Sequence, residues 1–204
     1  MKLKGAILIL SGPSGAGKSS LYKRLAQEFP NHYFSISSTT RQKREGQIHG
    51  VHYNFISKDA FEIGINQGDF LEWAKVHNHY YGTSKAQVIQ ALEQDKLVIF
   101  DIDVQGQANL KKAFPRHTTS VFITTKTKSI LKDRLGGRRS DEDSVIQKRL
   151  ENALDEVKNL PNYDYLIINE NLEEATNKLL CIARSAFCKA SLYELESFLQ
   201  NWEK

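Results

Sequence analysis

Short, uninterrupted runs of apolar residues recur along the chain. They cover residues 6–10, 97–101, 120–124 and 165–168. Strands that are buried on both faces of a parallel sheet show this pattern, because neither set of alternate side chains meets water. Other stretches have apolar residues at helical spacing, at 18–29, 105–113, 127–135, 144–159 and 172–202. Strands that alternate with helices predict an α/β fold with a mostly parallel sheet flanked by helices.

Two segments interrupt this alternation. Residues 33–83 carry short aromatic and hydroxyl-rich pieces between glycines, which predicts a small inserted lobe with short strands of its own. Residues 136–141 (Gly-Gly-Arg-Arg-Ser-Asp) form a second irregular piece. There Ser140 and Asp143 make a capping-box pattern for the helix that follows. At roughly 150 residues per domain, the whole chain is expected to form one domain.

Composition places the chain among ordinary globular proteins. Of 204 residues, 40% are apolar and 25% are charged, which excludes a disordered chain. The net charge, 28 − 24 = +4, is too small to indicate a nucleic-acid binder, although it suits a site for a small polyanion. The longest apolar runs have about five residues where a transmembrane helix needs about 20. We therefore expect small-molecule partners, and neither nucleic acid nor a membrane.

The cysteines and the N-terminus bear on the compartment. Cys181 and Cys188 cannot form a disulfide framework, and without CxxC spacing they offer no zinc site. Seven residues apart on a predicted helix, they should share one face, and we expect two buried, reduced thiols. The N-terminal apolar run is shorter than the 7–15 or so residues of a signal-peptide core. These features predict a cytoplasmic protein.

One motif carries explicit chemistry. The pattern GxxxxGKS is matched in full by Gly12, Pro13, Ser14, Gly15, Ala16, Gly17, Lys18 and Ser19. It stands between the first predicted strand and a predicted helix, which is the context that a phosphate-binding loop requires. Glycines let backbone N–H groups curl around phosphate oxygens, while Lys18 would reach the β- and γ-phosphates and Ser19 would ligate Mg²⁺. The chain is therefore predicted to bind a nucleoside triphosphate.

Seven further motifs follow the phosphate-binding loop. They are Ser37-Ser38-Thr39-Thr40-Arg41 with Arg44, Gly50 and Tyr53; 70–74 (FLEWA); 81–84 (YGTS); 101–106 (DIDVQG); Arg134-Leu135 with Arg138; 148–150 (KRL); and 167–169 (IIN). In this order and spacing, essentially the whole chain resembles the guanylate kinases. The resemblance implies Mg²⁺-dependent phosphoryl transfer from ATP to GMP, and to dGMP, in purine nucleotide metabolism. It also implies a P-loop core (1–36, 84–135 and 144–204), a GMP-binding lobe (37–83) and a lid (136–143).

The same resemblance implies roles for individual residues. The GMP phosphate is held by Arg41, Arg44, Tyr53 and Tyr81. Guanine is surrounded by Ser37, Glu72, Thr83 and one aspartate of the pair Asp101 and Asp103, and Gly82 is also expected to bind GMP. ATP is bound by the phosphate-binding loop with Ser20, Arg134, Arg138 and Asn169. The transferring phosphoryl group is met by Lys18, Arg41, Arg138 and Arg149. Ser19 and Asp101 are the expected Mg²⁺ ligands, although the sequence leaves open which of Asp101 and Asp103 approaches the metal.

Elementary chemistry supports these roles. ATP and GMP together bring about six negative charges, since the second phosphate pKa is near 6. A loose phosphoryl transfer needs in-line positioning and neutralised charge, and a dianionic GMP phosphate needs no general base. The carboxylate of Glu72 could accept hydrogen bonds from both N1–H and the N2 amino group of guanine, whereas adenine presents a lone pair at N1.

Two other functions and two structural alternatives stay open at this point. Domains of this kind also serve as non-catalytic protein-binding modules, and related kinases act on other phosphorylated acceptors such as a ribose bisphosphate. The intact Lys18 argues against the first, and Glu72 against the second. Thr83 or Ser84 could simply cap a helix that begins at Lys85, with Gln87 completing a capping box. Asp101 could be a loop-capping aspartate, and the choice between monomer and homodimer is undecided.

Four places depart from the family pattern. Lys43 stands where a proline is common, Glu45-Gly46-Gln47 replaces Pro-Gly-Glu, Asn78 occupies a frequent glycine position, and Arg139 replaces a glycine after Arg138. None of these departures removes a proposed contact. We expect them to change the stiffness of the GMP-binding loop and the geometry of the lid, and hence the turnover rate more than the reaction.

Overall fold

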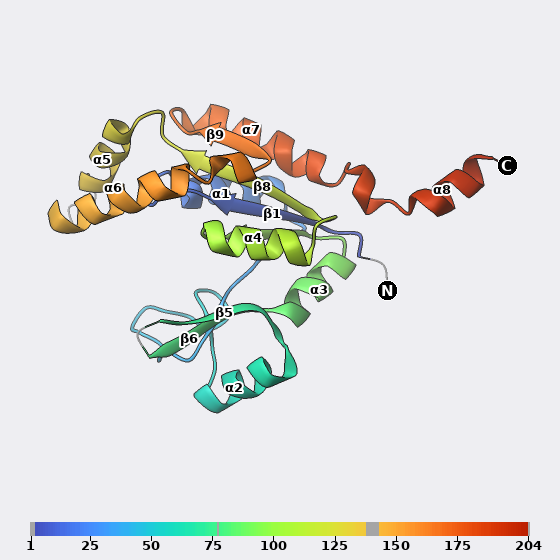
Figure 1. Cartoon of the computed structure of the whole chain (residues 1–204), viewed down its shortest axis with the longest axis horizontal. Coiled ribbons are helices and arrows are strands. Elements are labelled where there is room, and N and C mark those ends of the chain that lie inside the picture. Colours follow the sequence, from blue (N-terminus) through green and yellow to red (C-terminus); the bar gives the residue numbers. More distant parts are fainter. Residues whose placement is uncertain (1–2, 77, 138–142, 204) are drawn as a thin grey trace.

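A five-stranded, all-parallel sheet in the order β2-β7-β1-β8-β9 forms the centre of the protein. The structure is a computed structural model that describes residues 3–76, 78–137 and 143–203 (Figure 1). The strands are β1 (Ala6–Ser11), β2 (His32–Phe34), β7 (Leu97–Asp101), β8 (Thr118–Thr124) and β9 (Tyr165–Ile168). All four strands expected from apolar runs are confirmed, and β8 begins two residues earlier than expected.

Helices cover both faces of this sheet. They are α1 (Lys18–Glu28), α3 (Lys85–Glu93), α4 (Val104–Ala113), α5 (Lys128–Gly136), α6 (Asp143–Val157) and α7 (Leu172–Ala186), with short 3-10 turns at Leu160–Asn162 and Ala190–Leu192. The last helix, α8 (Leu195–Trp202), extends away from the sheet (Figure 1). Leu8 and Leu10 of β1 join the apolar cluster under α1 and α7, whereas Ile7 and Ile9 join the cluster under α3 and α4. Alternate residues of one strand thus fill two cores, which explains the uninterrupted apolar run.

The inserted lobe is confirmed as a separate small layer below the main sheet in Figure 1. Its elements are β3 (Ser38–Thr39), β4 (Asn54–Phe55), α2 (Lys58–Gln67), β5 (Phe70–Val76) and β6 (His79–Ser84), with sheet order β4-β3-β6-β5. Phe61 of α2 stacks on Phe70 at 4.2 Å and on Tyr80 at 5.2 Å between ring centroids. Helix α2 was not predicted from the sequence. Its signals were Ser57, whose hydroxyl caps the helix, and Gly68, which ends it at φ 72°.

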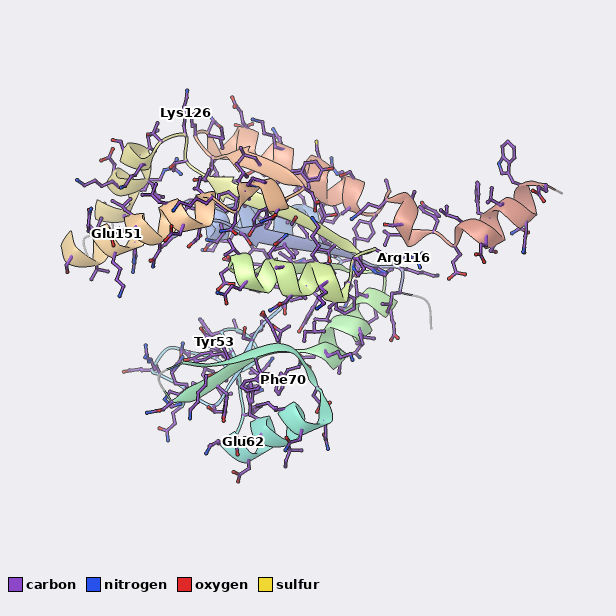
Figure 2. All side chains as sticks on the ribbon, viewed as in Figure 1. Tyr53, Glu62, Phe70, Arg116, Lys126 and Glu151 are labelled. Atoms are coloured by element: carbon purple, nitrogen blue, oxygen red, sulfur yellow. The ribbon has the colours of Figure 1, made fainter. Side chains whose placement is uncertain are left out.

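The C-terminal region is not the single helix expected over 172–202. Helix α7 ends at Ala186, and α8 begins only after a break. At the break, the guanidinium of Arg116 donates hydrogen bonds to the carbonyl oxygens of Ser191 (2.6 Å) and Tyr193 (3.0 Å) (Figure 2). A continuous helix would use those carbonyls for its own backbone bonds. A residue far away in sequence therefore helps to end the helical pattern.

Both cysteines are free and exposed, so the expectation of buried thiols is wrong. Cys181 lies on α7 opposite the face that packs on the sheet. Cys188 follows the end of that helix, so the assumption that both residues share one helical face fails with the helix itself. Among the helices that the structure describes, none is both long enough and apolar enough to cross a membrane.

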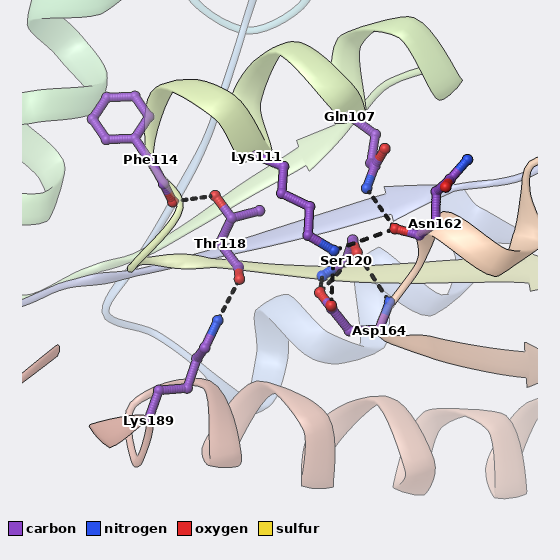
Figure 3. A network of polar contacts seen from close by, with 8 residues as sticks. All are labelled: Gln107, Lys111, Phe114, Thr118, Ser120, Asn162, Asp164 and Lys189. Carbon is purple, nitrogen blue, oxygen red and sulfur yellow. Dashed lines mark hydrogen bonds and ion pairs between the residues drawn. The ribbon is translucent and has the colours of Figure 1, made fainter. Parts of the chain in front are cut away.

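A polar network ties α4 to the start of β9 (Figure 3). One carboxylate oxygen of Asp164 lies 2.9 Å from the ammonium of Lys111, and the other accepts hydrogen bonds from the backbone N–H and the hydroxyl of Ser120, both at 2.8 Å. Gln107, which is buried, donates to the carbonyl oxygen of Asn162 at 3.2 Å. Burial alone would raise the pKa of Asp164, but the hydrogen bonds from Lys111 and Ser120 outweigh it and hold the pKa below its ordinary value.

Replacing Asp164 with alanine should lower the free energy of unfolding by about 1–2 kcal/mol at pH 7, because Ser120 and Lys111 lose an ionised acceptor. A lowered carboxyl pKa stabilises the fold above the unfolded-state value of about 3.9, and that contribution disappears as the pH falls through the folded-state pKa. Urea unfolding across this pH range tests the sign. Asp155→Ala is the control, since Asp155 pairs with Lys158 on the exposed surface, and a loss no larger than that control's would contradict the role of the network.

Candidate active site

The phosphate-binding loop connects β1 to α1 as the sequence predicts. Gly12, Gly15 and Gly17 have φ values of 133°, 88° and 96°, a region that side chains disfavour. A Cβ on Gly12 would lie 1.9 Å from the carbonyl oxygen of Ile123, and one on Gly17 would lie 2.3 Å from the amide nitrogen of Asn169. Both glycines are therefore required by close packing as well as by backbone conformation.

Lys18 lies at the centre of this loop. Its ammonium donates hydrogen bonds to the carbonyl oxygens of Gly12 (2.5 Å) and Pro13 (3.4 Å), and it lies 3.8 Å from the carboxylate of Asp101. Asp101 ends β7 and is paired in register with Leu10 of β1. The phosphate-binding loop follows the same end of β1, so the parallel sheet brings the side chains of Asp101 and Lys18 together. Burial raises the pKa of Asp101, and the positive charge of Lys18 partly offsets this.

The residues beside Lys18 fit a magnesium ion only in part. Ser19 is exposed in the first turn of α1, and Asp101 supplies a carboxylate at the neighbouring strand end. Hydroxyl and carboxylate oxygens suit Mg²⁺, which keeps several waters and phosphate oxygens in its shell. Within the described residues, no group of three or more His, Cys, Asp or Glu side chains could hold a metal by itself. This donor set therefore fits an ion that arrives with a nucleotide.

Asn169, which follows β9, supports the phosphate-binding loop through a hydrogen bond. Its side-chain amide is buried and donates to the carbonyl oxygen of Ala16 at 2.8 Å. Its backbone oxygen accepts a hydrogen bond from the guanidinium of Arg134 at 2.7 Å. Both residues line a hollow of about 310 Å³ together with Gly15, Gly17, Ser20, Glu170 and Leu172. Two residues expected to bind ATP thus lie together beside the loop, with Ser20 at the same hollow.

A second hollow, of about 280 Å³, lies between the lobe and the core. Its lining includes Ser37, Glu72, Tyr81, Gly82, Thr83 and Asp103. Glu72 of β5 faces Thr83 of β6, and the Thr83 hydroxyl lies 3.4 Å from a carboxylate oxygen of Glu72. Burial raises the pKa of Glu72, the charge of Asp103 raises it further, and the hydrogen bond from Thr83 opposes the change.

The two aspartates that the sequence could not separate face different partners. Asp101 lies beside Lys18, whereas Asp103 caps α4 by accepting a hydrogen bond from the backbone N–H of Gly106 at 2.9 Å. Asp103 also lines the hollow that holds Glu72. The loop-capping alternative considered for Asp101 therefore describes Asp103 instead.

The capping box considered as an alternative at the start of α3 does not form. Ser84 occupies the N-cap position but makes no side-chain capping bond. Gln87, the proposed partner, accepts a hydrogen bond from the hydroxyl of Tyr33 at 2.9 Å. Thr83 is turned toward Glu72, so its hydroxyl belongs to the hollow and does not cap the helix.

The residues expected at the GMP phosphate gather in the lobe. The guanidinium of Arg41 lies over the ring of Tyr53 at 5.5 Å, and Tyr53 packs edge-on against Tyr81 at 5.9 Å. Arg44 belongs to the same loop and is exposed. Gln47 accepts hydrogen bonds from the side chain of Arg41 and the backbone of Arg44. Tyr53 is therefore in contact with two of the other expected residues, Arg41 and Tyr81.

The expected lid is the least complete part of the site. Arg138, Arg139 and Ser140 lie outside the described residues, and so does the proposed capping box of α6. Arg149 lies on α6, which packs against α5 through an apolar cluster. The contacts of the two lid-side arginines expected at the transferring phosphates therefore stay predictions.

Two polar residues near the site, Glu156 and Tyr163, were not predicted from the sequence. Burial raises the pKa of Glu156, while Lys18 lowers it and Asp103 raises it, so this carboxylate faces the same charges as the site. The hydroxyl of Tyr163 is buried, and burial raises its pKa. Glu156 lies seven residues after Arg149, which puts both on one face of α6. The seven-residue spacing from Arg149 was the signal in the sequence that could have placed Glu156 near the site.

Comparison with known proteins agrees with this geometry. The guanylate kinase family model matches residues 4–186. The guanylate kinase of Wolinella succinogenes is 52% identical over 200 residues, which cover 98% of this chain and 93% of the relative. That of Helicobacter pylori is 52% identical over 197 residues, 97% of this chain and 95% of the relative. The crystal structure of guanylate kinase from Anaplasma phagocytophilum superposes with a TM-score of 0.73 at 26% identity and covers 98% of this chain and 95% of that one. The chain therefore belongs to the guanylate kinase family.

Proposed function

We propose that this protein transfers the γ-phosphoryl group of ATP to GMP, and to dGMP, giving ADP and GDP. One observation carries the proposal. Asp101 and Asp103, two residues apart after β7, face Lys18 of the phosphate-binding loop and the hollow of Glu72 respectively. Two sites of different chemistry, one for a triphosphate and one for a base, therefore meet at the same strand end, where ligands bind in open α/β sheets.

The triphosphate side supplies positive charge and backbone donors. Lys18 is already directed into the loop by the carbonyl oxygens of Gly12 and Pro13, and it would exchange them for phosphate oxygens when ATP binds. Magnesium, held through Ser19 and Asp101 with phosphate oxygens and water, would supply further positive charge. Arg134 and Asn169 lie at the adjacent hollow, where the remainder of ATP would be held.

The acceptor side supplies recognition. Arg41, Arg44, Tyr53 and Tyr81 would hold the phosphate of GMP as a dianion, which attacks without a general base. Glu72, supported by Thr83, would accept hydrogen bonds from the N1–H and N2 amino groups of guanine. Closure of the lobe onto the core would exclude water from the transferring group.

We also propose a cytoplasmic location, since two exposed free thiols fit a reducing compartment.

An acceptor panel tests the reaction directly. ADP formation from Mg-ATP is measured with GMP, dGMP, AMP, CMP, UMP and a ribose bisphosphate as acceptors. We expect transfer to be confined to GMP and dGMP, because a carboxylate matches two adjacent donors and a site with unpaired polar groups rejects other bases by up to about 10⁴–10⁵. GMP binding without transfer to any acceptor would instead support the non-catalytic binding module, and transfer to the ribose bisphosphate would support a different kinase.

A further inference from the structure

The loop between β3 and β4 carries both arginines proposed for the GMP phosphate, and one amide links them. The side-chain oxygen of Gln47 accepts a hydrogen bond from Nη2 of Arg41 at 2.9 Å and another from the backbone N–H of Arg44 at 3.1 Å. The backbone N–H of Gln47 donates to the carbonyl oxygen of Arg44 at 3.1 Å. A single side-chain atom thus links the guanidinium of Arg41 to the backbone of Arg44.

Arg41 is held on several sides. Besides Gln47, its guanidinium donates to the carbonyl oxygen of Gln42 at 2.8 Å and lies over the rings of Tyr53 and Phe55 at 5.5 Å and 5.8 Å. Of these partners, only Gln47 joins Arg41 to Arg44. Among residues 42–50, all of which the structure describes, Gln47 alone is half-buried and the others are exposed. Its side chain is therefore turned inward against this arrangement.

The charge of the side chain at position 47 matters because Arg41 is proposed to bind an anion, the phosphate of GMP. Both groups that face the Gln47 oxygen are donors, which fixes the orientation of the amide. An amide is neutral, so it can orient Arg41 without offsetting the positive charge of the guanidinium. The glutamate that the family pattern has at this place would keep both hydrogen bonds and also form an ion pair with Arg41 that competes with a bound phosphate.

We propose that Gln47 is a positioning residue for the phosphate of the acceptor nucleotide, and that its neutrality leaves the charge of Arg41 available to that phosphate. The inference rests on the proposed function, because it assumes that this loop receives the GMP phosphate. It assigns to Gln47 a contribution to phosphate affinity and none to recognition of the base.

The test compares Gln47→Ala with the unmodified protein by calorimetric titration of GMP and of guanosine, which lacks the phosphate. We expect the dissociation constant for GMP to rise by about threefold to tenfold, because the loss of one or two hydrogen bonds at a half-exposed site has an effect of this size. The constant for guanosine and the KM for ATP should stay unchanged. Gln42→Ala is the matched control, because it removes an exposed glutamine side chain from the same loop and keeps the carbonyl that Arg41 uses.

A second variant, Gln47→Glu, separates charge from geometry. It retains an oxygen that can accept both hydrogen bonds, so the loop stays ordered, but the added negative charge should weaken GMP binding at low salt. Relative to the unmodified protein, this loss should shrink as salt is added, whereas the loss in Gln47→Ala should not. Thermal unfolding of all variants verifies that each one is folded.

The outcomes distinguish a failure of the role assigned to Gln47 from a failure of the proposed function. Equal losses of GMP and guanosine affinity in Gln47→Ala would overturn the inference, since they would indicate general support of the lobe. Tighter GMP binding by Gln47→Glu would overturn the part about neutrality. Normal GMP affinity in Gln47→Ala would overturn the inference alone, and failure of the unmodified protein to bind GMP would overturn the proposed function with it.

Discussion

Replacing Lys18 with alanine is expected to lower kcat for ATP-dependent phosphorylation of GMP by at least about a thousandfold. The reason is electrostatic, because the charge that develops on the transferring phosphoryl group loses a positive group directed at it from the phosphate-binding loop. The loop itself should survive the change, since its backbone conformation depends on glycines and on the contact between Asn169 and Ala16. The substitution therefore separates catalysis from folding.

The measurement is steady-state ADP formation, combined with thermal unfolding of both proteins. Lys23→Ala serves as the control, because Lys23 lies on the same helix and is exposed away from the site. Its kinetics should match those of the unmodified protein. Retained activity in Lys18→Ala with an intact fold would contradict the assignment of the phosphate-binding loop. An equal loss in Lys23→Ala would point to damage of α1.

The sequence predicted the core of this protein well because the determinants are local. Each strand of the main sheet except β2 is a short apolar run, and both faces of β1 are buried by helices, as that pattern requires. The phosphate-binding loop was equally visible. Its glycines are constrained by backbone conformation and by contacts as short as the 1.9 Å that a Cβ on Gly12 would make.

Features that depend on distant residues were not predictable. Nothing in the sequence around residues 187–194 shows that Arg116 takes two of its carbonyl oxygens. Likewise, the helical spacing of Cys181 and Cys188 does not reveal which face meets the sheet. In the site, Asp101 and Asp103 are equivalent by sequence, and only the pairing of β7 with β1 and the start of α4 assign one to Lys18 and the other to Glu72.

Departures from the family pattern gain physical meaning in the structure. Asn78 adopts φ 66°, a left-handed conformation that asparagine accepts more readily than most side chains, so a frequent glycine position is filled with little strain. Gln47 supplies a hydrogen-bond acceptor to two arginines. Neither departure disrupts the lobe.

Replacing Glu72 with glutamine should change the use of GMP far more than the use of ATP. A carboxylate accepts from both N1–H and the N2 amino group of guanine, whereas an amide offers one acceptor and sets its own NH₂ against the other donor. We expect kcat/KM for GMP to fall roughly 10²- to 10³-fold, below the limit for a fully mismatched site, with KM for ATP unchanged. IMP lacks the N2 amino group, so the preference for GMP over IMP should collapse in the same variant.

The pH dependence of binding provides a second, independent test of the role of Glu72. Burial and the nearby charge of Asp103 raise the pKa of Glu72 above the ordinary glutamate value, so its carboxylate is protonated sooner as the pH falls. Guanosine lacks the phosphate group, which itself titrates at about pH 6, so its binding isolates this carboxylate. Guanosine affinity of the unmodified protein should therefore decline as the pH falls through that raised pKa, while Glu72→Gln should show no such decline. Glu62→Gln is the control, because Glu62 lies on α2 beside Lys58 and the hydroxyl of Tyr80, and is not among the residues that line the hollow (Figure 2). Parallel losses for GMP and ATP in Glu72→Gln would show that Glu72 supports the fold of the lobe and does not read the base.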